Sequence, residues 1–308
     1  VKNPDNYEWL KNSTKNETMK IYDSQFMIIN HLEFNTEMFF DVFLPLIIFA
    51  TGFNMRRQNF FENIVNIAKF GLLGTLLTFA FYSLMTWLAN KYIGFYYWKA
   101  YGGEWLPFEM DMVEILFFCS IFCSSDIIAA VTIIKFEDQP KLFSVILGEG
   151  LFNDAVAIIL FQTMKDLMLE FKREGDDPEI NFMLYLKIVR NFFALSGASI
   201  GVGTLLGVIA TLMLKNFRFI SHSAIGESSL LICCALMGYF ISEIFELSGI
   251  VSILCTSLVY SHYAWFNLSP QGKNITSILF QTLGYLAEGT VFIYLGVSSV
   301  YYLVYHPV

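Results

Sequence analysis

Charged side chains are scarce in this chain of 308 residues. Asp, Glu, Lys and Arg make up 15% of the sequence, whereas an average soluble domain has about 25%. Hydrophobic residues make up 56% and aromatic residues 17%. The net charge is −8, so the chain lacks the basic surface of a nucleic-acid-binding protein. The composition predicts an integral membrane protein whose main partner is the lipid bilayer, with no nucleic-acid partner.

Patterns typical of metal sites and of catalysis are missing as well. The five cysteines include no Cys-x-x-Cys pair and the four histidines are scattered, so we expect no resident metal and no cofactor. No nucleophile, base and orienting group stand together, so we do not expect an enzyme. Residues 1–37 are largely polar and lack the basic start and short apolar run of a signal peptide.

Eight apolar segments follow and are separated by polar connectors. They predict membrane helices at about 38–53, 64–89, 112–134, 142–164, 182–214, 224–245, 247–261 and 276–303. The first and seventh are short for the roughly 20 residues of a span, and the fifth is long enough to include an interfacial turn. The expected organisation is a polar segment (1–37), a membrane helix bundle (38–303) and a tail (304–308).

Small residues recur on the fifth predicted span at the spacing of packed membrane helices. Gly197 and Gly201 form one Gly-x-x-x-Gly pair, and Gly203 and Gly207 form another. Such pairs allow two helix backbones to approach closely.

The fourth span carries two carboxylates and an amide, which are Glu149, Asn153 and Asp154. A carboxylate at the bilayer centre costs about 2.5–3.5 kcal/mol on insertion scales, so it is rare there unless it is paired or functional. Asn153 follows Glu149 by four residues, which places both on nearly the same helix face. These residues are therefore candidates for a functional site.

The third span contains Ser124, Ser125 and Asp126 between apolar residues. Serines beside an aspartate compete for backbone hydrogen bonds and can unwind a helix. Unwound backbone at membrane depth is tolerated where it lines a cavity, and transporters bind ions there. The alternative is that Asp126 lies in a loop at the membrane boundary.

Other polar or helix-breaking residues have weaker interpretations. Pro45 in the first span removes a backbone donor and would kink the helix. Glu243 and Glu246 lie near a span end, where carboxylates are usually interfacial, while Glu288 lies deeper in the eighth span. A membrane carboxylate that can hold either a proton or a metal cation is sufficient for exchange, because one ion must leave before the other binds.

Several motifs resemble those of the eukaryotic sodium/proton exchangers, the electroneutral branch of the cation/proton antiporters. Residues 148–155 (Gly-Glu-Gly-Leu-Phe-Asn-Asp-Ala) are similar to that family's Gly-Glu-Ser/Gly-x-x-Asn-Asp-Ala signature. Residues 123–126 (Cys-Ser-Ser-Asp) are similar to its Ala-Thr-Asp motif. Residues 39–49 resemble its Phe-Phe-x-x-Leu-Leu-Pro-Pro-Ile-Ile-Phe helix, with Leu46 in place of the second proline. Further matches lie in residues 242–250, 261–263, 267–270 and 287–296.

The resemblance implies an all-α, antiporter-like membrane bundle with a broken crossover helix. It implies exchange of Na⁺ or K⁺ for H⁺, with no metal other than the transported cation. Asp154 matches the carboxylate that binds the ion and the proton, with Asn153 beside it, and Ser125 and Asp126 fall on the crossover. The resemblance gives supporting positions to Glu149, Ser124, Pro45, Glu243 and Glu288, and it implies an arginine partner for Glu149 on a later helix.

The resemblance covers about eight of the family's roughly thirteen spans, so the inverted repeat is incomplete. In one interpretation the sequence is a partial exchanger, or its missing spans lie on another chain, and transport survives. The expected partners are then a second copy in a homodimer or other membrane subunits that supply the missing spans. In the other it is a transport-inactive structural subunit of a larger membrane complex. An exchanger would lie in the plasma membrane or an endomembrane, whereas a complex subunit could lie in the mitochondrial inner membrane. An arginine near Glu149 would favour the first interpretation. If these residues were the whole ordered protein, we would expect no transport by the chain alone and an interface above about 2,000 Å².

Overall fold

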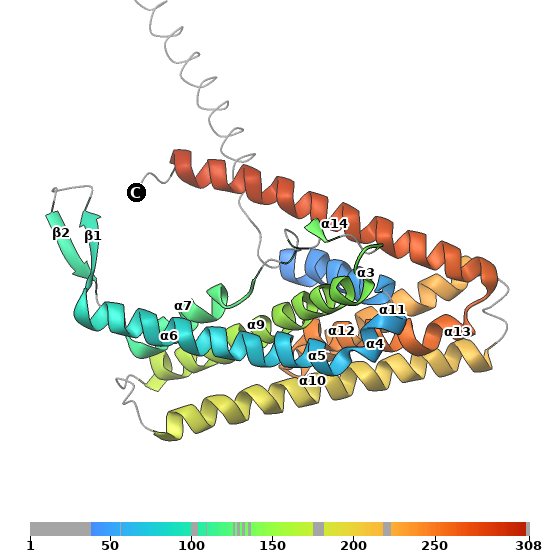
Figure 1. Ribbon diagram of the computed structural model, residues 1–308, viewed down its shortest axis with the longest axis horizontal. Coiled ribbons are helices and arrows are strands. Elements are labelled where there is room, and N and C mark those ends of the chain that lie inside the picture. The colour runs from blue at the N-terminus through green and yellow to red at the C-terminus, as the bar shows by residue number, and fades with distance from the viewer. Residues whose placement is uncertain are drawn as a thin grey trace, which may run out of the picture. The chain divides into compact units, whose positions relative to one another are not determined.

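The computed structural model describes residues 38–55, 57–99, 104–108, 110–125, 127, 130, 133–134, 137–174, 182–217 and 223–305 (Figure 1). The predicted segment 1–37 lies outside these residues, as do Asp126 and the last three residues of the tail. The chain divides into two compact units, one made of residues 44–284 and the other of residues 1–43 and 285–308. The residues of the candidate ion site that the structure describes belong to the first unit.

The first part of the chain forms short helices that continue into one another. After a π-helical turn, η1 (Phe39–Phe43), come the helices α3 (Leu44–Asn54), α4 (Arg57–Glu62) and α5 (Ile64–Ala68). A second π-helical segment, η2 (Lys69–Gly74), leads into α6 (Thr75–Tyr92). The helix α7 (Met112–Phe122) follows a short β-hairpin.

The second part consists of longer helices. These are α9 (Pro140–Glu174), α10 (Phe182–Asn216), α11 (Ala224–Ile244) and α12 (Gly249–Val259), then the π-helical η4 (Tyr260–Ala264), α13 (Trp265–Asn267) and α14 (Pro270–Tyr305). In Figure 1, α9 and α10 run lengthwise through the described bundle.

The predicted helical membrane bundle is confirmed, with one short β-hairpin as the exception. In the described residues, six helices are long and apolar enough to cross a membrane, and two shorter apolar helices cover Phe39–Asn54 and Met112–Phe122. Together they account for all eight predicted segments. The predicted lengths were partly wrong. The seventh span reaches Asn267 through η4, and α10 is one continuous helix without the interfacial turn that its length had suggested.

The sequence did not predict the hairpin between α6 and α7. Strands β1 (Phe95–Lys99) and β2 (Glu104–Phe108) pair in antiparallel register. Gly94 ends α6 in a left-handed conformation, with φ of 73°, and its N–H donates to the Ala89 carbonyl. Glycine adopts this conformation without steric cost, and the aromatic residues that follow favour strands over helix.

One of the two glycine pairs on α10 packs as predicted. A Cβ atom added to Gly203 would collide with the carbonyl oxygen of Ser252 on α12, and one added to Gly207 would lie 2.8 Å from Cβ of Val259. At Gly197 and Gly201 no described atom lies within 4 Å of such a Cβ. Only the second pair therefore brings α10 close to α12.

Candidate functional site

The third membrane segment is broken where the sequence predicted. Helix α7 begins with a capping box formed by Asp111 and Glu114, and it ends at Phe122. Cys123 forms a turn, and Ser124 and Ser125 have no regular secondary structure. Because Ser124 and Ser125 lie outside the helix, their side chains can form hydrogen bonds with residues of the neighbouring helix α9. The interruption is confirmed as far as Ser125, whereas the predicted proximity of Asp126 to Asp154 concerns a residue outside the described part.

Asp154 meets the broken segment through Ser124. The Ser124 hydroxyl donates a hydrogen bond of 2.7 Å to Oδ1 of Asp154. Both side chains are exposed, whereas Ala155 and Val156 beside them on α9 are buried. The carboxylate therefore accepts a hydrogen bond from a side chain that can itself act as an oxygen ligand.

Asn153 makes the second link between α9 and the break. Its side chain is only 4% exposed. Its amide nitrogen donates to Oγ of Ser125 at 2.8 Å and to the Ser125 carbonyl at 3.4 Å. Its amide oxygen accepts from the Thr75 hydroxyl at 2.7 Å. Since both ends of the amide are engaged, Asn153 fixes the position of Ser125 relative to α9.

Thr75 was not identified by the sequence analysis. It is buried at the start of α6, directly after η2, and its hydroxyl also lies within hydrogen-bond distance of the Gly71 carbonyl. Gly71 in η2 packs tightly on α9, because an added Cβ would lie 2.5 Å from Cβ of Phe152 and 3.1 Å from the Glu149 carbonyl. π-Helical turns often occur at functional sites. The only signal in the sequence was a hydroxyl among glycines in an apolar span.

Glu149 lies one turn before Asn153 on α9 and is half-buried. Within the residues that the structure describes, its side chain has no hydrogen bond and no arginine partner. The pairing implied by the resemblance therefore stays a prediction.

Pro45, Glu243 and Glu288, the remaining supporting residues, lie on helices other than α9. Pro45 is buried in the first turn of α3, directly after the π-helical turn η1. Glu243 accepts a hydrogen bond of 2.9 Å from the Gly249 N–H, so it stabilises the start of α12. Glu288 lies on α14 in the other compact unit. No group of three or more potential metal ligands occurs in the described residues.

Comparison with known proteins identifies the family. Residues 15–305 match the family described as "Sodium/hydrogen exchanger, transmembrane". Sodium/hydrogen exchanger 2 of Arabidopsis thaliana is 31% identical over 87% of this chain and 45% of its own length. An uncharacterised Na⁺/H⁺ antiporter of Schizosaccharomyces pombe is 32% identical over 92% of this chain and 47% of its own. Sodium/hydrogen exchanger 9 of Equus caballus is 27% identical over 88% and 40%.

The chain spans less than half the length of each of these relatives. Within that span, the match covers the broken third segment, the signature on α9 and all the helices that hold them. With six described helices able to cross a membrane, this is an integral membrane protein. The chain belongs to the sodium/hydrogen exchanger family.

Proposed function

We propose that this chain provides the ion-binding part of a cation/proton exchanger, with Asp154 alternately protonated and bound to a cation. The observation that carries the proposal is the pair of contacts across the broken span, from Ser124 to Asp154 and from Asn153 to Ser125. They join a membrane carboxylate to unwound backbone, and this combination coordinates Na⁺ and H⁺ in transporters with broken helices.

The hydroxyl of Ser124 suits both states of the carboxylate. A hydroxyl has one hydrogen to donate and lone pairs to accept with. When Asp154 is ionised, Ser124 donates to it, as in the structure. When Asp154 carries the transported proton, the same hydroxyl can accept it. When a cation binds, the oxygens of Ser124 and Asp154 can both face it. Proton and cation then compete for one carboxylate, so neither can bind until the other has left.

Asn153 is proposed as a positioning residue rather than as a direct ligand in this conformation. Its amide oxygen accepts from Thr75, and its nitrogen donates to Ser125. Through these bonds it holds the crossover backbone against α9. Asp126, the next residue after Ser125, is proposed as a second carboxylate of the site, and Glu149 as a support that pairs with an arginine.

The cation, the partners and the compartment belong to the whole protein and are proposed on the family resemblance. The relatives named sodium/hydrogen exchangers make Na⁺ the first cation to test, and K⁺ the second. We propose a homodimer or an association with other membrane subunits that supply further spans. The plasma membrane or an endomembrane is the proposed compartment.

The test replaces the carboxylate while keeping its shape. In a protein completed by the missing spans, Asp154→Asn should abolish sodium-driven proton flux in sealed vesicles, because an amide cannot take up a proton or hold a cation by charge. Flux is read from a pH-sensitive dye trapped in the vesicles. Asp138→Asn, at an exposed position of the connector before α9, is the matched control and should transport normally. Undiminished flux in the Asp154→Asn protein would remove Asp154 from the mechanism.

A further inference from the structure

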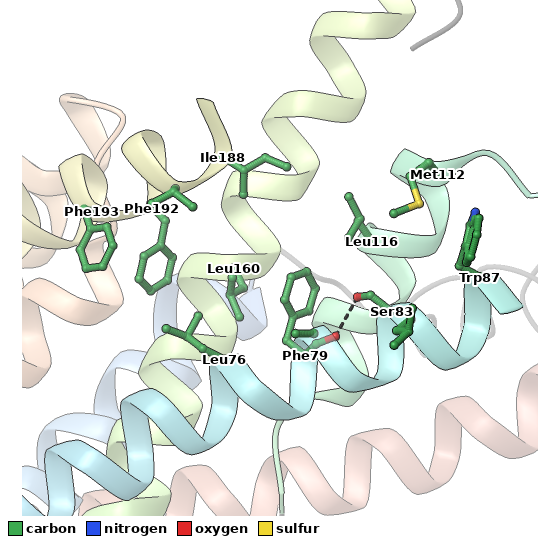
Figure 2. A pocket seen from close by; sticks show the side chains of 13 residues that line it. Leu76, Phe79, Ser83, Trp87, Met112, Leu116, Leu160, Ile188, Phe192 and Phe193 are labelled. Carbon is green, nitrogen blue, oxygen red and sulfur yellow. Dashed lines mark hydrogen bonds between the residues drawn. The ribbon is translucent and has the colours of Figure 1, made fainter. Parts of the chain in front are cut away.

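An apolar groove lies between α6, α7, α9 and α10 (Figure 2). Its volume is about 500 Å³, within the roughly 300–1,000 Å³ of ligand pockets. Of the side chains that line it, only Ser83 and Trp87 carry a polar atom. The Ser83 hydroxyl donates to the Phe79 carbonyl at 2.7 Å on its own helix. The interior therefore offers no polar side chain that needs water, and it suits an apolar occupant.

The length of the groove matches one leaflet of a bilayer. Along α6 it extends from Trp87 to Leu76, which is about 16 Å at 1.5 Å per residue. The hydrocarbon core of a bilayer is about 30 Å thick, so one leaflet is about 15 Å deep. The Trp87 end lies next to the last turn of α6, and Met112 at the start of α7 lines the same groove. The groove therefore runs from the membrane surface towards the middle of the spans.

The groove is open along its side. Leu84 on α6 is 51% exposed, and Val189 and Phe193 on α10 are 51% and 58% exposed. These three side chains are among those that line the groove. Because all four helices belong to apolar membrane segments, an acyl chain suits an opening between them.

The surface end of the groove carries a positive charge. Nζ of Lys91 lies 5.1 Å from the ring centroid of Trp87, and Lys91 has no acidic partner in the described part of the chain. The nearby acids of α7, Asp111 and Glu114, are engaged in the capping box. Lys187 is paired with Glu170 at 2.6 Å. Trp and Lys are typical anchors at the membrane surface, where lysines attract lipid phosphates.

We propose that this groove binds one glycerophospholipid, with an acyl chain between α6, α7, α9 and α10 and the phosphate at Lys91 and Trp87. The apolar lining accounts for the acyl chain, and the ammonium group of Lys91, which has no acidic partner in the described residues, accounts for the phosphate. The proposal does not depend on transport activity.

The test uses a phosphatidylcholine that carries a photoreactive diazirine near the end of one acyl chain. The protein is reconstituted in phosphatidylcholine vesicles containing this probe and irradiated, and the labelled residues are mapped by mass spectrometry. We expect labelling to concentrate at Leu76, Leu116 and Phe192. Ala80→Trp should fill the groove and reduce this labelling about tenfold, since a bulky side chain displaces a ligand from a site that it occupies. Leu77→Trp, on the 70% exposed side of the same helix, is the control and should leave it unchanged.

A second arm tests the headgroup. Lys91→Gln should reduce labelling by the phosphatidylcholine probe about fivefold, because one lysine near a membrane surface contributes a modest attraction to phosphate. Labelling by a diacylglycerol probe, which has no phosphate, should not change. Labelling of the groove residues no stronger than that of Leu77 would overturn the proposal. So would crosslinks from the groove to another protein segment, because the occupant would then be a helix.

Discussion

Two regions of this membrane protein hold polar side chains at depth, and they hold them differently. Where α10 packs on α12, hydroxyl groups bond to backbone of the neighbouring helix. The Thr256 hydroxyl donates to the Gly203 carbonyl at 2.9 Å, and the Ser199 hydroxyl accepts from the Ser248 N–H at 2.9 Å. All of these side chains are fully buried. They act as packing contacts between helices, which is the common role of small polar residues in membranes.

At the break after α7, side chains bond to side chains instead. Ser124 bonds to Asp154, and Ser125 bonds to Asn153. The partners Ser124 and Asp154 are exposed in the described structure. The protein therefore uses glycine and hydroxyl contacts for close packing, whereas the proposed function requires the exposed carboxylate and its hydroxyl partner to bind an ion.

The largest expected effect on folding comes from adding a methyl group where α10 packs closely on α12. Gly203→Ala places a methyl group against the Ser252 carbonyl, where backbone cannot yield easily, and should cost about 1–3 kcal/mol of stability. Gly201→Ala has open space and should leave stability unchanged or slightly higher, because alanine favours helix over glycine. Thermal unfolding of both proteins in detergent measures the difference. Equal loss in the two variants would mean that α10 does not approach α12 through Gly203.

The next effect concerns ion binding at the break. Ser124→Ala removes the hydroxyl oxygen that is proposed to face the cation beside Asp154. The Na⁺ concentration for half-maximal proton flux should therefore rise about tenfold, which corresponds to about 1.4 kcal/mol. A sodium titration in vesicles measures it. Ser144→Ala removes a hydroxyl that bonds only to Pro140 on its own helix and should not shift the titration.

The smallest expected effect on proton flux comes from removing the hydrogen bond between Thr75 and Asn153. Thr75→Val keeps the shape of the side chain but leaves the amide oxygen of Asn153 without its donor, at a cost of about 1 kcal/mol or more. Flux should fall severalfold, because Ser125 is held less firmly. Thr282→Val, whose hydroxyl bonds to Ile278 on its own helix, is the control. Full flux in Thr75→Val would show that Asn153 can position Ser125 without the hydrogen bond from Thr75.

Much of this comparison was predictable from the sequence. Hydropathy located all eight apolar segments, because a membrane span must be apolar over its whole length. The polar run at Ser124 and Ser125 predicted the break, because polar groups at that depth must find partners. The Asn153 and Asp154 pair was recognised for the same reason.

Other features follow from tertiary contacts and could not be predicted. Thr75 looks like any hydroxyl in an apolar helix, because most of them bond back to their own helix, as Thr163 does. Its hydrogen bond to Asn153 forms because η2 packs closely on α9 at Gly71, and no sequence pattern shows that packing. The two glycine pairs of α10 have the same spacing, and only the position of α12 distinguishes them. The continuous α10 also depends on contacts that no local pattern specifies, whereas Gly94 and the aromatic residues after it were a local signal for the hairpin.

Competition between proton and cation at Asp154 is the central claim, and chemical modification tests it directly. Dicyclohexylcarbodiimide reacts with protonated carboxyl groups in membrane proteins, and peptide mapping reports how much of Asp154 is modified. We predict that modification of Asp154 falls as Na⁺ is added at fixed pH, and that lowering the pH restores it. The exposed carboxyl group of Asp138 should not respond to Na⁺. Modification of Asp154 that is independent of Na⁺ over the whole pH range would contradict the account.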